Sequence, residues 1–409
     1  MKRRVRAALM LIALVAIPLA NAQDITVHAY LDARLVAAPD MTSWTRGGVG
    51  KTRYGTADDG LRFGGAAVAI AIQATPSWLA FADVQYQTTD RSTLDVIEAY
   101  LRYRPVSTTP WRASVKVGAF MPPVSLENDG VGWTSPWTLT PSAINSWVGE
   151  ELRAIGAQGQ LEWRGKRQTL ALSGALFKDN DPTGTLLADR GWSVSDLTYG
   201  MGSKLRVPDA YARVFGDPDH TRYNPFQEID GRWGWYANLA WQAPGYGQVQ
   251  LMRYDNRADP AAHTVYEGSA DVFAWHTYFW SLGARTDTGA VTWIAQAMDG
   301  GTRIDPVPGL GVETRFRSAF LLVGWNLGAW RPALRVEHFS TGKRVNGSPT
   351  GRGESGNAVT AALNWRPRAW LRVTGEVLRV IGDRSELKAL GLPTHFAQTQ
   401  MQLSARLLY

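Results

Sequence analysis

Cysteine is absent from the 409-residue chain, so the protein has no disulfide, no thiolate chemistry and no cysteine-based metal site. Histidine is scarce, with six scattered residues, and the H-E-x-x-H spacing of zinc hydrolases does not occur. A G-x-S-x-G nucleophile turn is missing as well. These absences argue against catalysis, and the sequence predicts no catalytic residue, no metal site, no cofactor and no enzymatic activity.

Blocks of basic residues and long apolar runs are also missing after residue 22. The chain has 43 Lys+Arg and 36 Asp+Glu, but four of the basic residues lie in the first six positions. The remaining 39 basic and 36 acidic residues leave a net charge of only +3. This balance gives no indication of nucleic-acid binding. No segment of this part approaches the roughly 18 consecutive apolar residues of a membrane helix.

The first 22 residues have the pattern of an export signal. A basic start, Met1-Lys-Arg-Arg-Val-Arg6, is followed by the apolar run 7–19 and then by Ala20-Asn21-Ala22. This order is typical of a secretory signal peptide. The apolar run is too short to cross a hydrocarbon core of about 30 Å. We therefore expect a signal peptide at 1–22, cleaved near Ala22, and an exported mature chain at 23–409.

Aromatic residues and glycine are abundant, with 18 Trp, 14 Tyr and 41 Gly. Apolar and polar residues alternate along many segments, among them 25–35, 111–120 and 233–242. Because successive side chains of a strand point to opposite faces, each segment forms a strand with one apolar and one polar surface. An exported chain of such strands, without hydrophobic helices, predicts an all-β fold, a transmembrane antiparallel β-barrel.

About sixteen strands are expected. They are placed at 24–36, 61–73, 77–87, 94–104, 111–120, 154–164, 168–178, 231–242, 247–255, 270–284, 289–298, 315–327, 332–340, 357–366, 369–381 and 396–409. A barrel of this size leaves a water-filled channel, whereas eight strands are filled by their own side chains.

The links between these strands alternate between short and long, except for a short link at 88–93 where a long one is due. The long links are 37–60, 121–153, 179–230, 256–269, 299–314, 341–356 and 382–395. Bacterial barrels have this organisation, with short turns in the periplasm and long loops outside. A β-sandwich gives no reason for connections to be sorted in this way.

The C-terminal segment alternates to its last residue, with Leu403, Leu407 and Tyr409 on the apolar side. It resembles the last strand of outer-membrane barrel families, which ends on an aromatic residue that the assembly machinery reads. The resemblance implies that these three residues are an assembly signal. It also implies localisation in the bacterial outer membrane, with outer-membrane lipid, lipopolysaccharide and the barrel-assembly machinery as partners.

The whole mature pattern resembles Gram-negative outer-membrane porins. The local run 117–120, with Pro122 and Glu127, is similar to the phosphate-selective porin O/P group, although no matching run of lysines and arginines follows. The resemblance implies that 121–153 folds inward as a constriction loop and that the protein is a homotrimer. It further implies passive diffusion of small hydrophilic solutes through a water-filled channel.

Charged residues are expected on both sides of this passage. The loop 121–153 has the acidic residues Glu127, Asp129, Glu150 and Glu151. The channel-lining basic residues expected on the strands are Arg34, Arg102, Arg104, Arg112, Lys116 and Arg164. An acidic loop opposite a basic wall would create a transverse field that orients solutes and favours one ion sign. Alternatively, these charges only solvate a wide lumen. The excess of bases predicts a weak anion preference, with small anionic or neutral solutes.

Three tryptophans of the loop, Trp133, Trp137 and Trp147, form either a stacking surface for sugars or, as we prefer, packing contacts with the wall. A channel specific for sugars or phosphate therefore remains an alternative to passive diffusion. A plugged barrel with a structural, adhesive or enzymatic role is the other alternative. The long extracellular loop at 179–230 fits three roles equally: a latch to a neighbouring protomer, a shield of the outer mouth, or a lipopolysaccharide contact.

Overall fold

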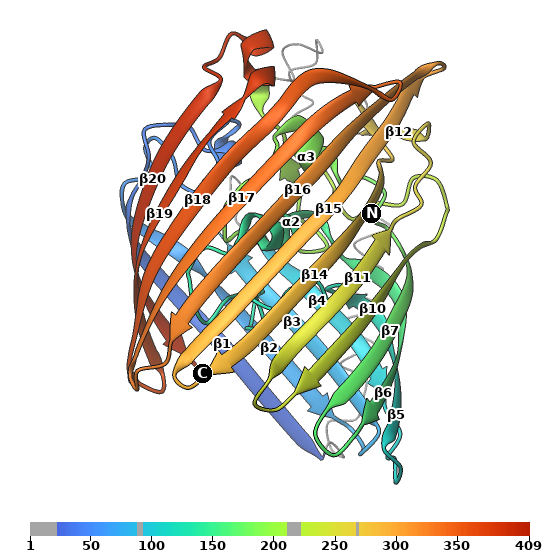
Figure 1. Ribbon diagram of the computed structural model, residues 1–409, viewed down its shortest axis with the longest axis vertical. Helices are drawn as coiled ribbons and strands as arrows, with labels where there is room; N and C mark the ends of the chain where they lie inside the picture. The colour runs from blue at the N-terminus through green and yellow to red at the C-terminus, as the bar shows by residue number, and fades with distance from the viewer. Residues whose placement is uncertain (1–22, 88–92, 211–221, 267–269) are drawn as a thin grey trace.

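Sixteen antiparallel strands form one closed barrel in the computed structural model (Figure 1). The structure describes residues 23–87, 93–210, 222–266 and 270–409. The predicted signal peptide and nearly all of the link at 88–93 lie outside these residues. The predicted all-β barrel and its strand number are confirmed.

The elements follow the predicted order along the chain. The barrel strands are β1 Asp24–Ala37, β2 Gly60–Gln73, β3 Trp78–Gln87, β4 Thr93–Tyr103, β5 Trp111–Phe120, β6 Ala154–Arg164, β7 Thr169–Lys178, β10 Gly234–Ala243, β11 Gly247–Asp255, β14 His276–Thr288, β15 Val291–Val307, β16 Leu310–Trp325, β17 Trp330–Val345, β18 Ser348–Arg368, β19 Leu371–Arg384 and β20 His395–Leu408. The links contain the helices α2 Ala143–Glu151 and α3 Thr185–Asp189, the 3-10 turns η2 Trp44–Arg46 and η3 Ser385–Leu390, and two small hairpins, β8 Leu205–Arg206 with β9 Arg222–Tyr223 and β12 His263–Tyr266 with β13 Ala270–Phe273.

The alternating sequence pattern becomes two different surfaces of the barrel wall. In β1, Leu31 and Leu35 point outward and are 49% and 56% exposed, whereas Asp32 and Arg34 point inward and are buried. The outer face is therefore apolar and the inner face polar, which is the reverse of a soluble protein. This inversion is expected of a sheet that crosses lipid, where closure leaves no unpaired strand edge.

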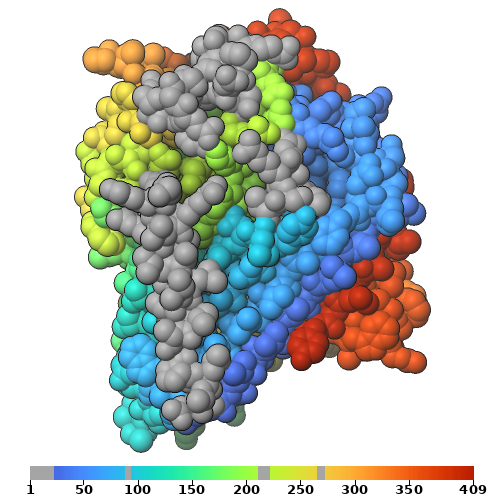
Figure 2. All heavy atoms as spheres, turned by 180° about the vertical axis from the view of Figure 1, so that it is seen from behind, coloured from blue at the N-terminus to red at the C-terminus, as the bar shows by residue number. Residues whose placement is uncertain are grey.

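Closure joins the two ends of the chain. Strand β1 pairs with β20 from Tyr30 opposite Leu408 to Ala37 opposite Met401. Figure 2 shows the first strands, in blue, beside the last strand, in red. The short turns gather at one end of the barrel, where the C-terminus also lies, and the longer links gather at the other (Figure 1). These two ends are called the short-turn end and the loop end below.

Two links predicted to be long are instead strand extensions. The predicted loops 299–314 and 341–356 are wrong, because β15 continues to Val307 and β17 to Val345, and only two residues join each to the next strand. In the second hairpin, Asn346 and Gly347 have φ of 48° and 81°. Positive φ at both central residues is the geometry of the tight Asn-Gly hairpin turn, and this residue pair is its local sequence signal.

One predicted strand is divided. The expected strand 270–284 begins as β13, which pairs with β12 outside the barrel sheet, and the barrel strand β14 starts only at His276. The predicted loop 382–395 is shortened, since β19 continues to Arg384 before η3. Among the described residues, no helix is long and apolar enough to cross a membrane.

Candidate functional site: the barrel interior

The segment 121–153 crosses the interior of the barrel. It leaves β5 and contacts β17, which lies eight strands away in the ring of sixteen and therefore opposite. Glu127 of the segment forms an ion pair of 2.6 Å with Arg335 on β17, and both side chains are fully buried. The backbone N–H of Ala143 donates to Glu337 on the same strand at 2.7 Å. Ion pairs and hydrogen bonds thus fix the segment to the far wall.

A second contact with the wall involves Glu376 on β19. Its carboxylate accepts hydrogen bonds from the backbone N–H groups of Leu139 and Thr140 and from the Thr140 hydroxyl, the last at 2.6 Å. A buried carboxylate needs such partners because it has lost its hydration. The inward-facing acids of β17 and β19 therefore hold the segment 121–153.

Helix α2 lies within the barrel, as Figure 1 shows between the front and rear strands. The Ser142 hydroxyl accepts from the Asn145 backbone N–H and caps the first turn, as N-cap serines do. All nine helix residues are buried. The indole of Trp147 packs against Trp192, Phe279 and Phe316, with ring centroids 5.2 to 6.1 Å apart. The interior therefore contains an apolar core around this helix.

The segment 179–210 also folds inward, which the sequence did not reveal. Arg190 pairs with Glu150 at 2.7 Å, and both side chains are fully buried. Asp196 pairs with Arg34 of β1 at 2.7 Å. The indole N–H of Trp192 donates to the Ser340 carbonyl at 3.0 Å. The apolar run 186–188 and Trp192, unusual in a solvated loop, are the sequence signal that could have indicated this burial.

A third segment, 38–59, completes the filling of the loop end. Lys51 pairs with Glu354 of β18 at 2.5 Å, and its backbone N–H donates to Gln398 of β20. Burial lowers the pKa of Lys51 to about 8. Thr52 forms a β-bridge with Val194 of the second inward segment. The three segments therefore contact one another as well as the wall.

The predicted acidic residues of 121–153 differ in exposure. Glu127, Glu150 and Glu151 are fully buried and have partners, so they do not face open water. Asp129 is 62% exposed and lies 4.0 Å from Arg285. Three of the four expected acids are thus buried in the packing, and two of them, Glu127 and Glu150, are paired with an arginine.

The three loop tryptophans make packing contacts. Trp137 and Trp147 are buried, and the guanidinium of Arg331 lies 4.9 Å from the Trp137 ring centre. Trp133 is half-buried, and its indole N–H donates to the Asn145 carbonyl at 3.0 Å. These positions agree with the packing interpretation.

The predicted basic residues fall into two groups. Arg34 is buried between Asp32 and Asp196, and Arg164 is paired with Glu162 near the short-turn end. Arg102, Arg104, Arg112 and Lys116 are partly exposed.

Within the second group, Arg102 of β4 lies directly opposite Lys116 of β5. Among the described residues, none of the four has a carboxylate within ion-pair distance. Glu162 lies opposite Arg112 in register and Glu98 interacts electrostatically with Lys116, so the basic wall toward the short-turn end is compensated only in part.

Two cavities remain beside the segment 121–153. One, of about 240 Å³, lies against the β3–β4 wall and is lined by Asp83, Glu98 and Trp133. The other, of about 460 Å³, lies at the short-turn end and is lined by Arg366, Arg372 and Arg406. The larger of these two cavities therefore lies away from the packed loop end.

Glu151 has four hydrogen-bond donors: the N–H groups of Gly184 and Leu186, the Trp147 indole and the Tyr223 hydroxyl. Burial nevertheless raises its pKa from 4.5 to about 7. Because this pKa is higher in the folded protein, protonated Glu151 stabilises the loop packing fully below pH 4.5. The contribution is lost as the pH rises to about 7. We expect proteolysis within 179–210 to be faster at pH 8 than at pH 5. The variant Glu151→Gln should show a weaker pH dependence, while the share due to Asp181 and Asp189, whose pKa values burial also raises, remains. Equal pH dependence in both proteins would contradict the assignment.

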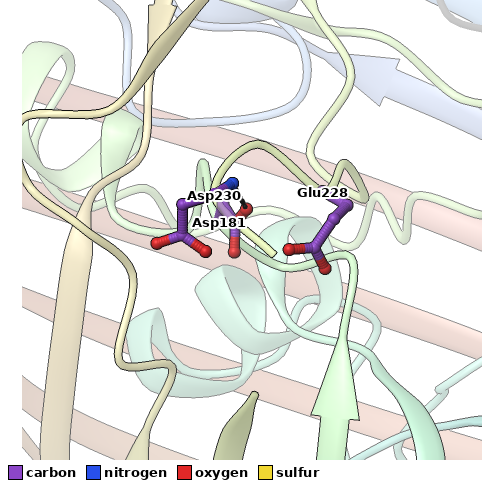
Figure 3. Close-up of side chains that lie close together, drawn as sticks. All are labelled: Asp181, Glu228 and Asp230. Atoms are coloured by element: carbon purple, nitrogen blue, oxygen red, sulfur yellow. Dashed lines mark hydrogen bonds between the residues drawn. The ribbon is translucent and has the colours of Figure 1, made fainter. Parts of the chain in front are cut away.

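Three acidic residues meet in the links that follow β7 and precede β10: Asp181, Glu228 and Asp230 (Figure 3). Their carboxylates accept backbone N–H groups: Asp181 from Ile229, Glu228 from Gly231 at 2.6 Å, and Asp230 from Asp259. Burial raises the pKa of Asp181 to about 7. The contacts are those of a cluster that shapes the loop, and we assign no metal to it.

The predicted assembly residues lie on the outer surface. Leu403 and Leu407 are about half exposed on the apolar face of β20. Tyr409 is 82% exposed, and its backbone exchanges hydrogen bonds with Ala29 of β1. The final residue therefore takes part in barrel closure.

Comparison with known proteins gives structural matches only. No family model matches the sequence, and no curated protein matches it. Among solved structures, a loop-deletion mutant of OmpT, an outer membrane protein of Vibrio cholerae, has a TM-score of 0.54 at 11% identity, covering 94% of this chain and 99% of that one. The outer membrane channel DcaP of Acinetobacter baumannii has a TM-score of 0.53 at 11% identity, with coverage of 96% and 98%.

A third match is an anion-selective porin from Comamonas acidovorans, with a TM-score of 0.51 at 11% identity and coverage of 94% and 99%. Identities at this level establish the architecture alone. They agree with the closed ring of sixteen strands and its apolar outer surface. The chain therefore has the fold of the sixteen-stranded outer-membrane porins.

Proposed function

We propose that the protein is an outer-membrane channel for small hydrophilic solutes with a weak preference for anions. The observation that carries this proposal is the closed barrel with a charged inner face, in which the accessible unpaired side chains of β4 and β5 are basic. Cations fixed in a narrow wet passage attract anions and repel cations. The short-turn end is then periplasmic, and the segment 121–153 acts as the constriction loop.

The same proposal includes an export signal at 1–22, a homotrimer, and contacts with lipopolysaccharide and the assembly machinery.

The proposal does not include catalysis. The imidazoles of His276 and His395 contact Asp255 and Asp383, and among the described residues no hydroxyl nucleophile is hydrogen-bonded to either ring. Turnover of peptide or ester substrates by the purified protein would contradict the absence of catalysis from the proposal.

A second candidate function is a channel that conducts only after its loops are displaced, and one observation favours it. Residues of 38–59, 121–153 and 179–210 contact the wall on many sides of the barrel at the loop end. A solute that binds the displaced form better than the packed form would open such a channel by shifting the population. Single-channel recordings separate the candidates, since passive diffusion requires openings without any added ligand.

The basic wall should determine ion preference. Replacing Arg102, Arg104, Arg112 and Lys116 together with glutamine should move the reversal potential in asymmetric KCl away from the chloride equilibrium potential. Arg379→Gln is the matched control, because Arg379 is exposed on β19 outside the lumen. If the fourfold variant kept the reversal potential of the unmodified protein, the wall would not determine selectivity.

A further inference from the structure

Two carboxylates face each other across β3 and β4. Asp83 of β3 is the direct register partner of Glu98 of β4. Both residues line the cavity of about 240 Å³ beside the segment 121–153. Like charges directly opposite in an antiparallel pair are destabilising. A sheet that keeps such a pair at one cavity therefore needs a positive charge close to it.

The nearby cations of the protein lie outside this cavity. Lys116 and Arg153 interact electrostatically with the acids, but neither lines the cavity. Among the described residues, neither has a carboxylate within ion-pair distance. The guanidinium of Arg153 donates to the carbonyls of Tyr199 and Ile97 at 2.6 and 3.0 Å. The ammonium of Lys116 lies 4.1 Å from the centre of the Phe120 ring. Both cations therefore reduce the repulsion only from a distance.

Two buried oxygen atoms at the cavity lack a hydrogen-bond donor. Asp83 is 4% exposed, and its Oδ2 accepts from the Gly132 N–H at 2.7 Å, but its Oδ1 has no partner among the described residues. Asn128 is also 4% exposed, and its Nδ2 donates to the Trp133 carbonyl. That bond fixes the orientation of the amide and leaves its Oδ1 without a partner in the described part of the chain. Buried acceptors normally have a donor, so these two oxygens indicate a ligand that donates hydrogen bonds.

The remaining lining is mostly apolar, with Ile97, Met121, Pro122, Pro123 and Trp133. A divalent cation requires about six oxygen ligands, which such walls do not provide. A protonated amine has three N–H donors, and its alkyl chain suits an apolar wall. An aromatic ring such as an indole also attracts a cation. The cavity therefore fits an organic ammonium group better than a bare metal ion.

We propose that this cavity binds the ammonium group of a small solute between Asp83 and Glu98, with Oδ1 of Asn128 as a further acceptor. The inference deepens the proposed function, on which it rests for a role in transport, because it names a class of solute. Lys116 of the basic wall interacts electrostatically with Glu98. A solute with both an ammonium group and a carboxylate therefore meets the cavity and the basic wall together. Such a zwitterion has no net charge, which agrees with a passage that repels bare cations.

Calorimetric titration of the folded full-length barrel in neutral detergent with propylammonium chloride tests the site without any current. We expect saturable binding, weakened about tenfold or more in Asp83→Asn, because a hydrogen bond to a charged group is lost. Glu98→Gln should weaken binding in the same way. Both amides keep an oxygen that accepts from the backbone N–H groups of Gly132 and Met121.

The control Asp383→Asn removes the same charge from the outer face of β19, where Asp383 is 70% exposed. This variant should bind propylammonium as the unmodified protein does. Equal affinity in Asp83→Asn and the unmodified protein, or no binding to either, would overturn the proposal.

A second ligand separates hydrogen bonding from charge alone. Tetramethylammonium has the same charge as propylammonium but no N–H donor, so it leaves the two unpaired oxygens without a partner. It should bind about tenfold more weakly, and equal affinity for the two cations would contradict the assignment. Magnesium chloride tests the metal alternative, since binding of Mg²⁺ without binding of propylammonium would also overturn it.

Thermal unfolding gives a readout that a purely structural carboxylate would not. Propylammonium should raise the melting temperature of the unmodified protein and leave that of Asp83→Asn unchanged. Heat-modifiable gel migration shows that each variant is folded before the comparison. An equal rise in both proteins would place the bound amine elsewhere and refute the site.

Ammonium groups occur in simple amines and in zwitterions, and a matched pair of ligands distinguishes the two. β-Alanine is propylammonium with its methyl group replaced by a carboxylate. Tighter binding of β-alanine supports a zwitterionic solute, and tighter binding of propylammonium supports a simple amine. Ammonium binding without any channel current would refute the proposed transport function and leave the site intact. Current without ammonium binding would do the opposite.

Discussion

Replacing Arg335 by methionine is expected to release the segment 121–153 from the wall and to raise the single-channel conductance severalfold. The Arg335 guanidinium lies between the carboxylates of Glu127 and Glu337, at 2.6 and 3.1 Å, and all three side chains are fully buried. It also donates to the carbonyls of Thr140 and Pro141 at 2.8 and 3.0 Å. Removing one partner of a buried ion pair costs about 3–5 kcal/mol, since it leaves a charge without compensation.

The matched control for this variant removes the charges of all three paired side chains. In the triple variant Arg335→Met, Glu127→Gln, Glu337→Gln, none of these three buried charges remains, and the amide oxygens still accept from the N–H groups of Ser142 and Ala143. Conductance should then fall back toward that of the unmodified protein. Limited proteolysis within 121–153 should follow the same order. Equal conductance in all three proteins would show that this ion cluster does not hold the segment.

Truncating Trp147 to alanine should raise the single-channel conductance by a similar factor, because packing in the barrel interior is lost. Its fully buried indole contacts Trp192, Phe279 and Phe316, and its N–H donates to Glu151 at 2.6 Å. Loss of a buried tryptophan side chain costs about 3–5 kcal/mol, because a cavity remains where the ring was. The segments 121–153 and 179–210 meet at this ring, so we expect higher conductance and faster proteolysis in both.

Trp280→Ala provides the control for Trp147→Ala. Trp280 is 51% exposed on the outer face of β14, so the same truncation there leaves the interior unchanged. Heat-modifiable gel migration should show a folded barrel for both variants. If Trp147→Ala matched Trp280→Ala in conductance and proteolysis, the interior core would not limit the passage.

The barrel was predictable because its signal is local. Period-two alternation determines which face of a strand meets lipid, and the expected bounds of β5, β6 and β11 agree with the structure. The errors arose where polar strands extend beyond the membrane. The hairpins around Gly309 and Asn346-Gly347 are exposed on both faces at their tips, so hydrophobic alternation fades while backbone pairing continues.

The interior was only partly predictable, because its contacts join residues distant in sequence. Loop acids were identified, but Glu150 is neutralised by Arg190 from a different segment, and Glu127 by Arg335 from the opposite wall. No local pattern specifies such pairs. Arg372 of β19 lies opposite Arg406 of β20 because of the strand register. A shift of one strand by one residue would move its side chains to the other face of the sheet.

An open, anion-preferring channel is tested most directly by single-channel recording of the purified mature protein in planar bilayers under asymmetric KCl. Such a channel should show small discrete openings without added ligand and a reversal potential displaced toward the chloride equilibrium potential. A correctly folded barrel that shows no openings, or a reversal potential displaced toward potassium, would contradict the proposed function.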